Sequence, residues 1–402
     1  MSAAERPCIT AHMPGTGGVI KECPEDFRVD EIPLYAPCGE GEHVFARLRK
    51  RGIATFEAVR QVAERLGIPE RYVTYAGLKD ARAVTSQWIS IFGVTEEAVE
   101  AVRLPNLELG EARRHANRLK LGHLRGNRFD IVVRNAEPGS LPRARAIMDV
   151  LLRRGVPNYY GEQRFGVRGD GHLYGRALLR RDYQGFLDRM LGGPPGTTLD
   201  ERILESRRLY DEGKLEAAYD SMPIKKRAEK KALGALVRFG DVETAVRAIP
   251  KRMRQIYASS FQSWLFNRIL VQRLETIDQL LEGDLAYLHR SGRVFRVEDA
   301  ELEQPRCTAF EVSPSGPMFG SRMTAPGGKP GEMEAEVLDS TGLLPKQFKT
   351  EQGLHMKGLR RSLRIPLREV CLEPIDETAY RVRFTLPSGS FATVVLAELL
   401  TP

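Results

Sequence analysis

The sequence predicts an α+β fold, with strands and helices at both ends of the chain and a helical insertion between them. Two observations support this prediction. Short segments near the N-terminus alternate apolar and polar residues, as half-buried strands do, while the stretch from 200 to 285 is charged and largely helical. At 402 residues, the chain exceeds the size at which one core stops growing, so we expect two or three domains.

The first part of the chain alternates strands with one clear helix. Strands are predicted over 27–32 and 43–48. The helix is expected to begin at Thr55, as an N-cap, and to stop at Gly67. Its buried face is expected to carry Phe56, Val59, Ala63 and Leu66. Further strands are predicted over 72–77 and 86–92, on either side of a turn at Lys79 and Asp80.

The middle of the chain begins with a predicted hairpin. Residues 120–134 are expected to form two strands joined by a turn at Gly126-Asn127, and a helix over 141–154 follows. The segment 158–166, Asn-Tyr-Tyr-Gly-Glu-Gln-Arg-Phe-Gly, breaks the pattern with two glycines and a Glu-Gln-Arg triplet. Residues 259–270 are apolar enough to form a buried helix.

The last part of the chain returns to strands. Residues 313–333 are rich in proline and glycine, so we expect a loop-rich junction there. An alternating strand over 380–386, a turn and a helix over 391–400 end the chain. The terminal segments of the chain are expected to share one sheet.

Composition excludes several classes of protein. The apolar fraction of 42% and the charged fraction of 28% are ordinary for a soluble globular protein. The sequence has no bilayer-spanning apolar run and no signal peptide, so we expect a cytoplasmic protein. The five cysteines are scattered and the seven histidines isolated, which disfavours disulfides and predicts no metal. The sequence has no dinucleotide-binding glycine motif, P-loop or nucleophile elbow, which disfavours a nucleotide cofactor, a methyltransferase and a serine hydrolase.

Charge indicates a polyanionic partner. The formal net charge is +8, and basic residues gather in runs. Any one run is equally consistent with a solvated helix face, but together they favour a phosphate-binding surface. The runs lie at 113–134, at 225–231 with 251–254, and at 357–364.

The strongest candidate for chemistry is Asp80, within Tyr75–Gln87. It lies among glycine, basic, hydroxyl and amide residues directly after a strand-like run. A loop carboxylate beside positive charge suits a nucleophile, or a reaction that develops cationic character. The alternative is a turn residue that bonds only nearby backbone amides. Once metal, phosphate-loop and serine chemistry are excluded, Asp80 is the best reactive group in the chain.

Several segments together resemble one family. Residues 77–87, Gly-Leu-Lys-Asp-Ala-Arg-Ala-Val-Thr-Ser-Gln, resemble the signature of the TruD family of tRNA pseudouridine synthases, in its archaeal-type form, and residues 158–166 are similar to the family's second signature. Shorter matches occur at 125–129, 260–267, 316–320 and 389–393. The matches run in order along almost the whole chain.

The resemblance implies an RNA uridine isomerase, most often acting on tRNA at position 13, without a cofactor. It implies a pseudouridine synthase-like catalytic domain with a mixed sheet, formed by residues 1–166 and 355–402. An inserted α/β TRUD domain over 167–354 would close a basic cleft for tRNA. Since that cleft would form within one chain, we expect a monomer.

The resemblance also implies roles for individual residues. Asp80 would be the nucleophile, acting at ribose C1′, at uracil C6, or as a base at C2′. Neighbours on an extended strand point to opposite faces, so Lys79 diverges from Asp80 unless the chain turns there. Lys21, which matches the family's N-terminal lysine, is therefore the better cationic partner, although a solvated surface lysine is the alternative.

The remaining candidates would support the pocket. Phe129 would stack on a flipped uracil, or else be a core residue of its strand. Asn127 would bond the uracil edge or shape its turn. Thr85 and Gln87 are expected to brace the Asp80 loop.

The second signature also contributes two candidates. Glu162 and Arg164 would form an ion pair that supports the pocket, in preference to a direct RNA contact.

Two alternatives stay open. One is a non-catalytic module that binds or folds tRNA, which would need the basic residues but not Asp80. The other is a pseudouridine synthase that acts on another RNA.

Overall fold

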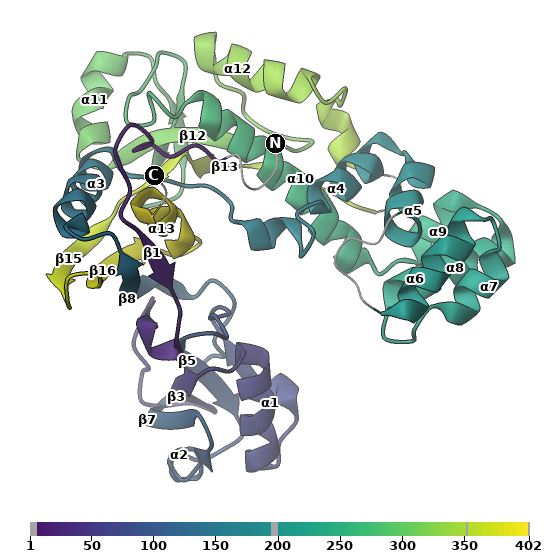
Figure 1. Ribbon diagram of the computed structural model, residues 1–402, viewed down its shortest axis with the longest axis horizontal. Coiled ribbons are helices and arrows are strands. Elements are labelled where there is room, and N and C mark those ends of the chain that lie inside the picture. The colour runs from purple at the N-terminus through teal and green to yellow at the C-terminus, as the bar shows by residue number, and fades with distance from the viewer. Residues whose placement is uncertain (1–5, 194–199, 351–352, 401–402) are drawn as a thin grey trace. The chain divides into compact units, whose positions relative to one another are not determined.

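The computed structural model describes residues 6–193, 200–350 and 353–400, which divide into two compact units (Figure 1). The sheet unit comprises Cys8–Val156 and the chain from Ile365 onward. The helical unit comprises Pro157–Arg364 together with Arg6 and Pro7. The sequence placed the two divisions after residues 166 and 354, whereas the compact units divide after Val156 and after Arg364. The roles expected of these domains stay predictions.

The sheet unit is built on one ten-stranded mixed sheet. Its order is β15-β16-β8-β2-β5-β3-β7-β6, with β1 paired to β8 and β4 paired to β5. The β2–β5 pair is parallel, and its β8 and β3 neighbours are antiparallel. The strands are β1 Gly17–Ile20, β2 Phe27–Pro33, β3 His43–Arg51, β4 Val73–Tyr75, β5 Val84–Phe92, β6 Arg103–Leu104, β7 Leu107–His115, β8 Leu124–Ala136, β15 Arg368–Pro374 and β16 Tyr380–Pro387. The predicted sharing of one sheet by both ends of the chain is confirmed.

Helices cover the sheet and close its core. The helices of this unit are α1 Thr55–Leu66, α2 Glu96–Glu100, α3 Ser140–Arg154 and α13 Ala392–Leu400, with short 3-10 turns at Pro24–Asp26 and Glu70–Tyr72. Val59 of α1 packs against Leu48 of β3 and Ile89 of β5, all buried. Helix α3 packs on β15, and α13 packs on α3 and β1.

Helix α1 corrects two sequence expectations. Its N-cap is Ala54, and Thr55 is the first helical residue. The Thr55 hydroxyl instead accepts the backbone N–H of Lys79 at 2.9 Å. Phe56 points outward with 62% of its surface exposed, so it does not belong to the buried face. The predicted stop is confirmed, because Gly67 ends the helix in a left-handed conformation with φ 67°.

The hairpin predicted over 120–134 is wrong. Gly126 and Asn127 lie inside the single long strand β8, which pairs with β2 on one side and β16 on the other. A Cβ at Gly126 would overlap the backbone oxygen of Leu386 in β16. The glycine therefore allows a close strand approach, and no turn forms there.

The helical unit begins with a row of helices and ends in a small sheet. Its helices are α4 Gly171–Arg180, α5 Tyr183–Leu191, α6 Glu201–Asp211, α7 Leu215–Ser221, α8 Arg227–Phe239, α9 Val242–Ala248, α10 Lys251–Gln272, α11 Ala300–Thr308 and α12 Gly328–Asp339, with 3-10 turns at Glu162–Phe165 and Pro345–Phe348. The sheet order is β11-β10-β12-β13, formed by Val294–Arg296, Leu285–Leu288, Val312–Met318 and Leu359–Ser362. The short strands β9 Val156–Pro157 and β14 Arg364–Ile365 pair with each other.

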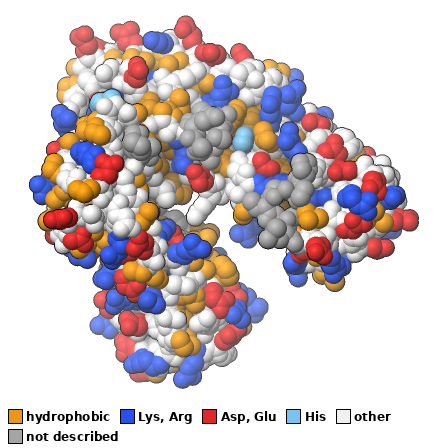
Figure 2. Space-filling model, in the orientation of Figure 1, with side chains coloured by type: hydrophobic (Ala, Val, Ile, Leu, Met, Phe, Trp, Pro, Cys, Tyr) orange, Lys and Arg blue, Asp and Glu red, His pale blue; other side chains and the backbone are white. Residues whose placement is uncertain are grey.

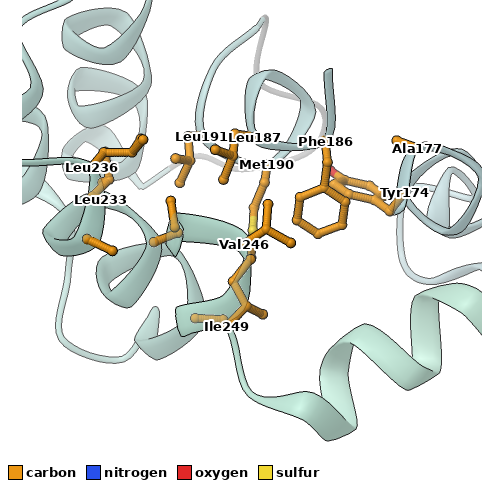
Figure 3. Packing of buried hydrophobic residues seen from close by; sticks show 14 of the residues in the cluster. Tyr174, Ala177, Phe186, Leu187, Met190, Leu191, Leu233, Leu236, Val246 and Ile249 are labelled. Carbon is orange, nitrogen blue, oxygen red and sulfur yellow. The ribbon is translucent and has the colours of Figure 1, made fainter. Parts of the chain in front are cut away.

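The core of the helical unit is formed mostly by apolar side chains from α4, α5, α8 and α9 (Figure 3), with Leu209 of α6, Ala218 of α7 and Ala258 of α10. Phe186 meets Tyr174 edge to face, with ring centroids 5.5 Å apart. Leu187, Leu233 and Val246 join the same buried cluster. Helix α10 contacts α4, β12 and α12, and its segment 259–270 is mostly buried, as predicted.

The loop-rich junction predicted over 313–333 is also wrong. Residues Val312–Met318 form the fully buried strand β12, and α12 begins at Gly328. A Cβ at Gly316 would lie 2.8 Å from Cδ2 of Leu363 and 3.2 Å from the Phe266 ring. Glycine is therefore needed here for close packing of the strand.

Candidate active site

Asp80 lies in the loop between β4 and β5, and three hydrogen bonds from other elements hold that loop. The Gln87 amide donates to the Gly77 carbonyl at 3.0 Å. The Lys79 N–H donates to Thr55 Oγ1 at 2.9 Å, and the Lys50 ammonium donates to the Asp80 backbone carbonyl at 2.7 Å. The position of Asp80 is thus fixed from β5, α1 and β3.

The Asp80 carboxylate combines a local turn bond with a distant ion pair. Oδ1 accepts the Arg82 N–H at 2.9 Å, the turn geometry that the simpler interpretation predicted. Oδ2 accepts a hydrogen bond from the Lys21 ammonium. Burial disfavours the charged form, but the bonds from Lys21 and Arg82 and the charge of Lys50 outweigh it, so the pKa of Asp80 is lowered. Asp80 is therefore a carboxylate at neutral pH.

Lys21 reaches Asp80 from the segment that follows β1. Its backbone is in the left-handed region, with φ 62°, which costs a non-glycine residue about 1–2 kcal/mol. Its ammonium lies over the Phe27 ring, 4.1 Å from the centroid. Held between this ring and the carboxylate, the ammonium is directed at Asp80. The expected pairing of Lys21 with Asp80 is present.

Lys50 is a second cation at the site, and the sequence analysis did not identify it. Its side chain is 1% exposed, and Nζ donates to the carbonyls of Ile53 and Asp80, each at 2.7 Å. Burial lowers the pKa of Lys50 to about 8, although the charge of Asp80 opposes the shift. In β3 it resembles an outward-facing strand lysine, so only the tertiary structure shows its position.

Lys79 takes a different partner from Asp80, although both residues lie in the loop between β4 and β5 and not on a strand. Its ammonium pairs with Glu31 of β2 at 2.6 Å, and the two side chains are 5% and 1% exposed. Glu31 also accepts the Trp88 N–H at 3.3 Å. This buried pair links the Asp80 loop to the sheet, and Glu31 is a further residue that the sequence analysis missed.

Phe129 and Asn127 both lie on β8, next to this group. Phe129 is 6% exposed and packs between Phe27, at 6.3 Å, and Phe384, at 5.3 Å between centroids. It thus contacts the ring on which Lys21 rests. Asn127 is the cross-strand partner of Glu31, and its Oδ1 is buried with no hydrogen-bond partner among the described residues.

The two residues expected to brace the loop behave differently. Gln87 is fully buried; its amide nitrogen donates to Gly77 of the loop, and its amide oxygen accepts from the Thr55 hydroxyl of α1. Thr85 is also buried, but its hydroxyl has no partner in the described part of the chain. The expectation that Thr85 braces the loop therefore stays a prediction, without a hydrogen bond to support it.

The predicted ion pair between Glu162 and Arg164 is also wrong. Both residues belong to the helical unit, where Glu162 faces Arg6 at 3.4 Å. Arg164 donates to the hydroxyls of Ser259 and Ser263 and lies 5.4 Å from the Tyr160 ring centroid. The side chains of a 3-10 turn diverge here, so each finds another partner.

Two observations on charge qualify the predicted phosphate-binding surface. On the face seen in Figure 2, blue Lys and Arg side chains alternate with red Asp and Glu side chains. In the third basic run, Arg360 pairs with the buried Glu334 at 2.7 Å. Arg364 is fully buried and donates to the Cys307 carbonyl. These two arginines therefore hold the small sheet together and add little to any surface.

Over residues 6–193, 200–350 and 353–400, no group of three or more His, Cys, Asp or Glu side chains could hold a metal ion. None of the helices in these ranges is both long and apolar enough to cross a bilayer.

Comparisons with known proteins agree along the whole chain. A family model described as tRNA pseudouridine synthase D (TruD) matches residues 4–399. The tRNA pseudouridine synthase D of Geobacter sulfurreducens is 47% identical, covering 98% of this chain and 96% of that protein. The protein of the same name from Anaeromyxobacter dehalogenans strain 2CP-C is 37% identical over 98% of this chain and 96% of its own. A crystal structure from Methanosarcina mazei that bears the TruD name has a TM-score of 0.83 at 26% identity, covering 98% of this chain and 95% of that one.

Proposed function

The chain belongs to the TruD family of tRNA pseudouridine synthases, isomerases that convert uridine to pseudouridine in tRNA, and we propose that Asp80 is its nucleophile. The observation that supports this role best is the paired, ionised carboxylate of Asp80. Lys21, Arg82 and Lys50 favour its charged form, while the loop bonds from Gln87 and Thr55 fix its position. An oriented carboxylate needs little reorganisation before it attacks.

The reaction exchanges one bond to ribose for another. The N1–C1′ bond breaks, the uracil turns, and a C5–C1′ bond forms; C5 loses a proton and N1 gains one. No electrons are gained or lost overall. Attack at C1′, attack at C6 and proton removal at C2′ all require the Asp80 carboxylate. In each route negative charge develops on the uracil, and nearby cations offset it.

We propose that Lys21 stabilises the Asp80 carboxylate and the negative charge that leaves it when Asp80 reacts. Lys50 and Gln87 hold the loop. Asn127 is our candidate for reading the uracil edge, because its buried Oδ1 is an acceptor that would suit the N3–H of uracil. Phe129 supports the site from behind through Phe27, and contact between its ring edge and the base stays a prediction.

We further propose that uridine 13 of tRNA is the target and that the enzyme is a monomer. We also propose that it is cytoplasmic, because tRNA is processed in the cytoplasm. The net charge of +8 supports association with the RNA backbone. The predicted basic cleft stays a prediction.

The test uses purified full-length protein and an unmodified tRNA transcript labelled with tritium at uridine C5. Isomerisation releases one tritium for each pseudouridine formed. We expect release from the wild-type transcript and none above background from a transcript with cytidine at position 13. No release from either transcript would contradict the function, while release from both would contradict the target position.

A further inference from the structure

The helical unit contains a cavity of about 390 Å³ that the proposed site does not use. It lies where the turn after the 3-10 segment Glu162–Phe165 meets helices α4, α6 and α10 and the start of α8. The cavity is in the size range of pockets that bind small molecules. Its lining combines cations with aromatic side chains, which complement the phosphate and the base of a nucleotide.

The charges lining the cavity favour an anion. Four cations, Arg164, Arg168, Arg207 and Lys226, face two acids, Asp170 and Glu229. The acids pair with Arg168 at 3.1 Å and, more loosely, with Lys226 at 3.7 Å. Arg164 and Arg207 keep a net charge of two that these acids do not offset.

Arg207 provides a directed donor. Its two terminal nitrogens donate to the carbonyls of Gly192, at 2.9 Å, and Met190, at 3.2 Å, which fix the guanidinium plane. Its Nε is buried and has no hydrogen-bond partner among the described residues. A buried donor without a partner costs about 1–3 kcal/mol, which an anionic ligand would recover.

The rest of the lining suits a base. Tyr257 and Met253 are partly buried and line the cavity, while Tyr174, which stacks on Tyr257 with centroids 4.7 Å apart, and Met190 belong to the buried core behind them. The Ser260 hydroxyl is buried and has no partner in the described ranges. At the rim, Val167 is 95% exposed although apolar. Aromatic side chains and hydrogen-bonding groups that reach the base edge are features of sites for unstacked bases.

We propose that this cavity binds one unpaired nucleotide of the RNA substrate, distinct from the uridine that is isomerised. Its phosphate bonds Arg207 and Lys226, its base lies against Tyr257 and Met253, and Ser260 bonds the base edge. The proposal rests on the proposed function, because it takes tRNA as the substrate. A paired base is stacked on both faces, so only a base turned out of the helix enters.

The test compares two lysines at the start of α8. Lys226 immediately precedes α8 and lines the cavity, whereas Lys231 is exposed within α8 and does not line it. The dissociation constant of unmodified tRNA is measured from 50 to 200 mM salt for wild type, Lys226→Gln and Lys231→Gln. We expect Lys226→Gln to weaken binding several-fold and to lower the slope of log K against log salt by about 0.7–0.9, with Lys231→Gln close to wild type. If Lys226→Gln and Lys231→Gln had equal slopes of log K against log salt, the proposed contact between Lys226 and a phosphate would be overturned.

Ser260→Ala tests the base contact. Removal of a buried hydroxyl that has no partner leaves the thermal stability of the free protein unchanged or raised. We expect the same variant to bind tRNA several-fold more weakly, an effect that a purely structural residue would not produce. Unchanged tRNA affinity would overturn the base contact.

Free uridine 5′-monophosphate and adenosine 5′-monophosphate identify the source of the nucleotide. Lys226-dependent binding of either one, with tRNA affinity unchanged in Lys226→Gln, would overturn the assignment to RNA. Wild-type tritium release measured alongside separates the two proposals. Tritium release by wild type, together with equal salt slopes for Lys226→Gln and Lys231→Gln, refutes only the cavity proposal. No tritium release, together with intact tRNA binding, refutes only the isomerase assignment.

Discussion

The ammonium of Lys21 and the carboxylate of Asp80 form an ion pair although 59 residues separate them in sequence. The neighbouring Lys79 instead pairs with Glu31 inside the sheet. Both residues lie in the loop between β4 and β5, so the tertiary contacts with Glu31 and Lys21 settle which partner each side chain takes. Lys79 therefore holds the loop, while Lys21 favours the charged form of the candidate nucleophile.

Lys21→Met should reduce catalysis and shift its pH dependence. Without the ammonium, burial raises the pKa of Asp80, so the acid limb of kcat/KM should move to higher pH. We expect kcat at pH 7.5 to fall about 100-fold. The measurement is tritium release from pH 4 to 9, with Lys21→Arg as the charge-conserving control. An unmoved acid limb in Lys21→Met would exclude Lys21 as the group that sets the ionisation of Asp80.

Lys50 should produce an alkaline limb. Its pKa in the folded protein is about 8, so above that pH the site loses a cation beside Asp80 and activity should fall. Lys50→Arg, if folded, should move this limb beyond pH 10. A profile that is flat from pH 7 to 10 in the wild-type enzyme would contradict the assignment.

The same shift predicts how stability depends on pH. The unfolded chain keeps the Lys50 proton up to about pH 10.5, whereas the folded chain loses it near 8. Between these values the unfolded state binds more protons, so the free energy of unfolding rises with pH. Relative to Lys50→Met, wild type should therefore gain stability from pH 8 to 10.5. Urea unfolding at both ends of this window measures the difference.

The buried pair of Glu31 and Lys79 should be costly to break. Glu31→Gln leaves the Lys79 charge buried without its partner, so we expect a loss of about 3–5 kcal/mol in the free energy of unfolding. The double variant Glu31→Gln, Lys79→Met should recover much of this loss. Additive single effects in this double-mutant cycle would show that the two side chains do not interact.

Gly126→Ala tests the corrected topology of β8. The added Cβ would overlap the Leu386 backbone oxygen, so β16 must shift, at a cost of about 1–3 kcal/mol. At Gly67, whose φ is 67°, alanine should also destabilise, by about 1 kcal/mol, through backbone strain alone. A neutral effect at Gly126 would contradict the close approach of β16 at this residue.

Much of the fold followed from local patterns. The strands around 27–32 and 43–48, the stop at Gly67 and the C-terminal strand and helix were predicted because alternation and capping depend on neighbours in sequence. The α+β class and the return of the chain end to the first sheet were also correct.

The errors arose where tertiary contacts override those patterns. Glycine marks turns, but Gly126 and Gly316 are present because another strand or side chain approaches closely. A basic run usually indicates a solvated surface, but Arg364 is buried beneath Phe310 and bonded to Cys307. Lys50 was missed for the same reason, since burial of a strand lysine depends on what packs over it.

The most direct test of the central claim is pseudouridine formation by Asp80→Asn. Tritium release from C5-labelled tRNA is measured beside Asp30→Asn, an exposed aspartate on β2 of the same sheet. We expect a loss of more than about 1,000-fold in kcat for Asp80→Asn, with the tRNA dissociation constant within a few-fold of wild type and Asp30→Asn fully active. Turnover by Asp80→Asn at a rate close to wild type would contradict the assignment of Asp80 as the nucleophile.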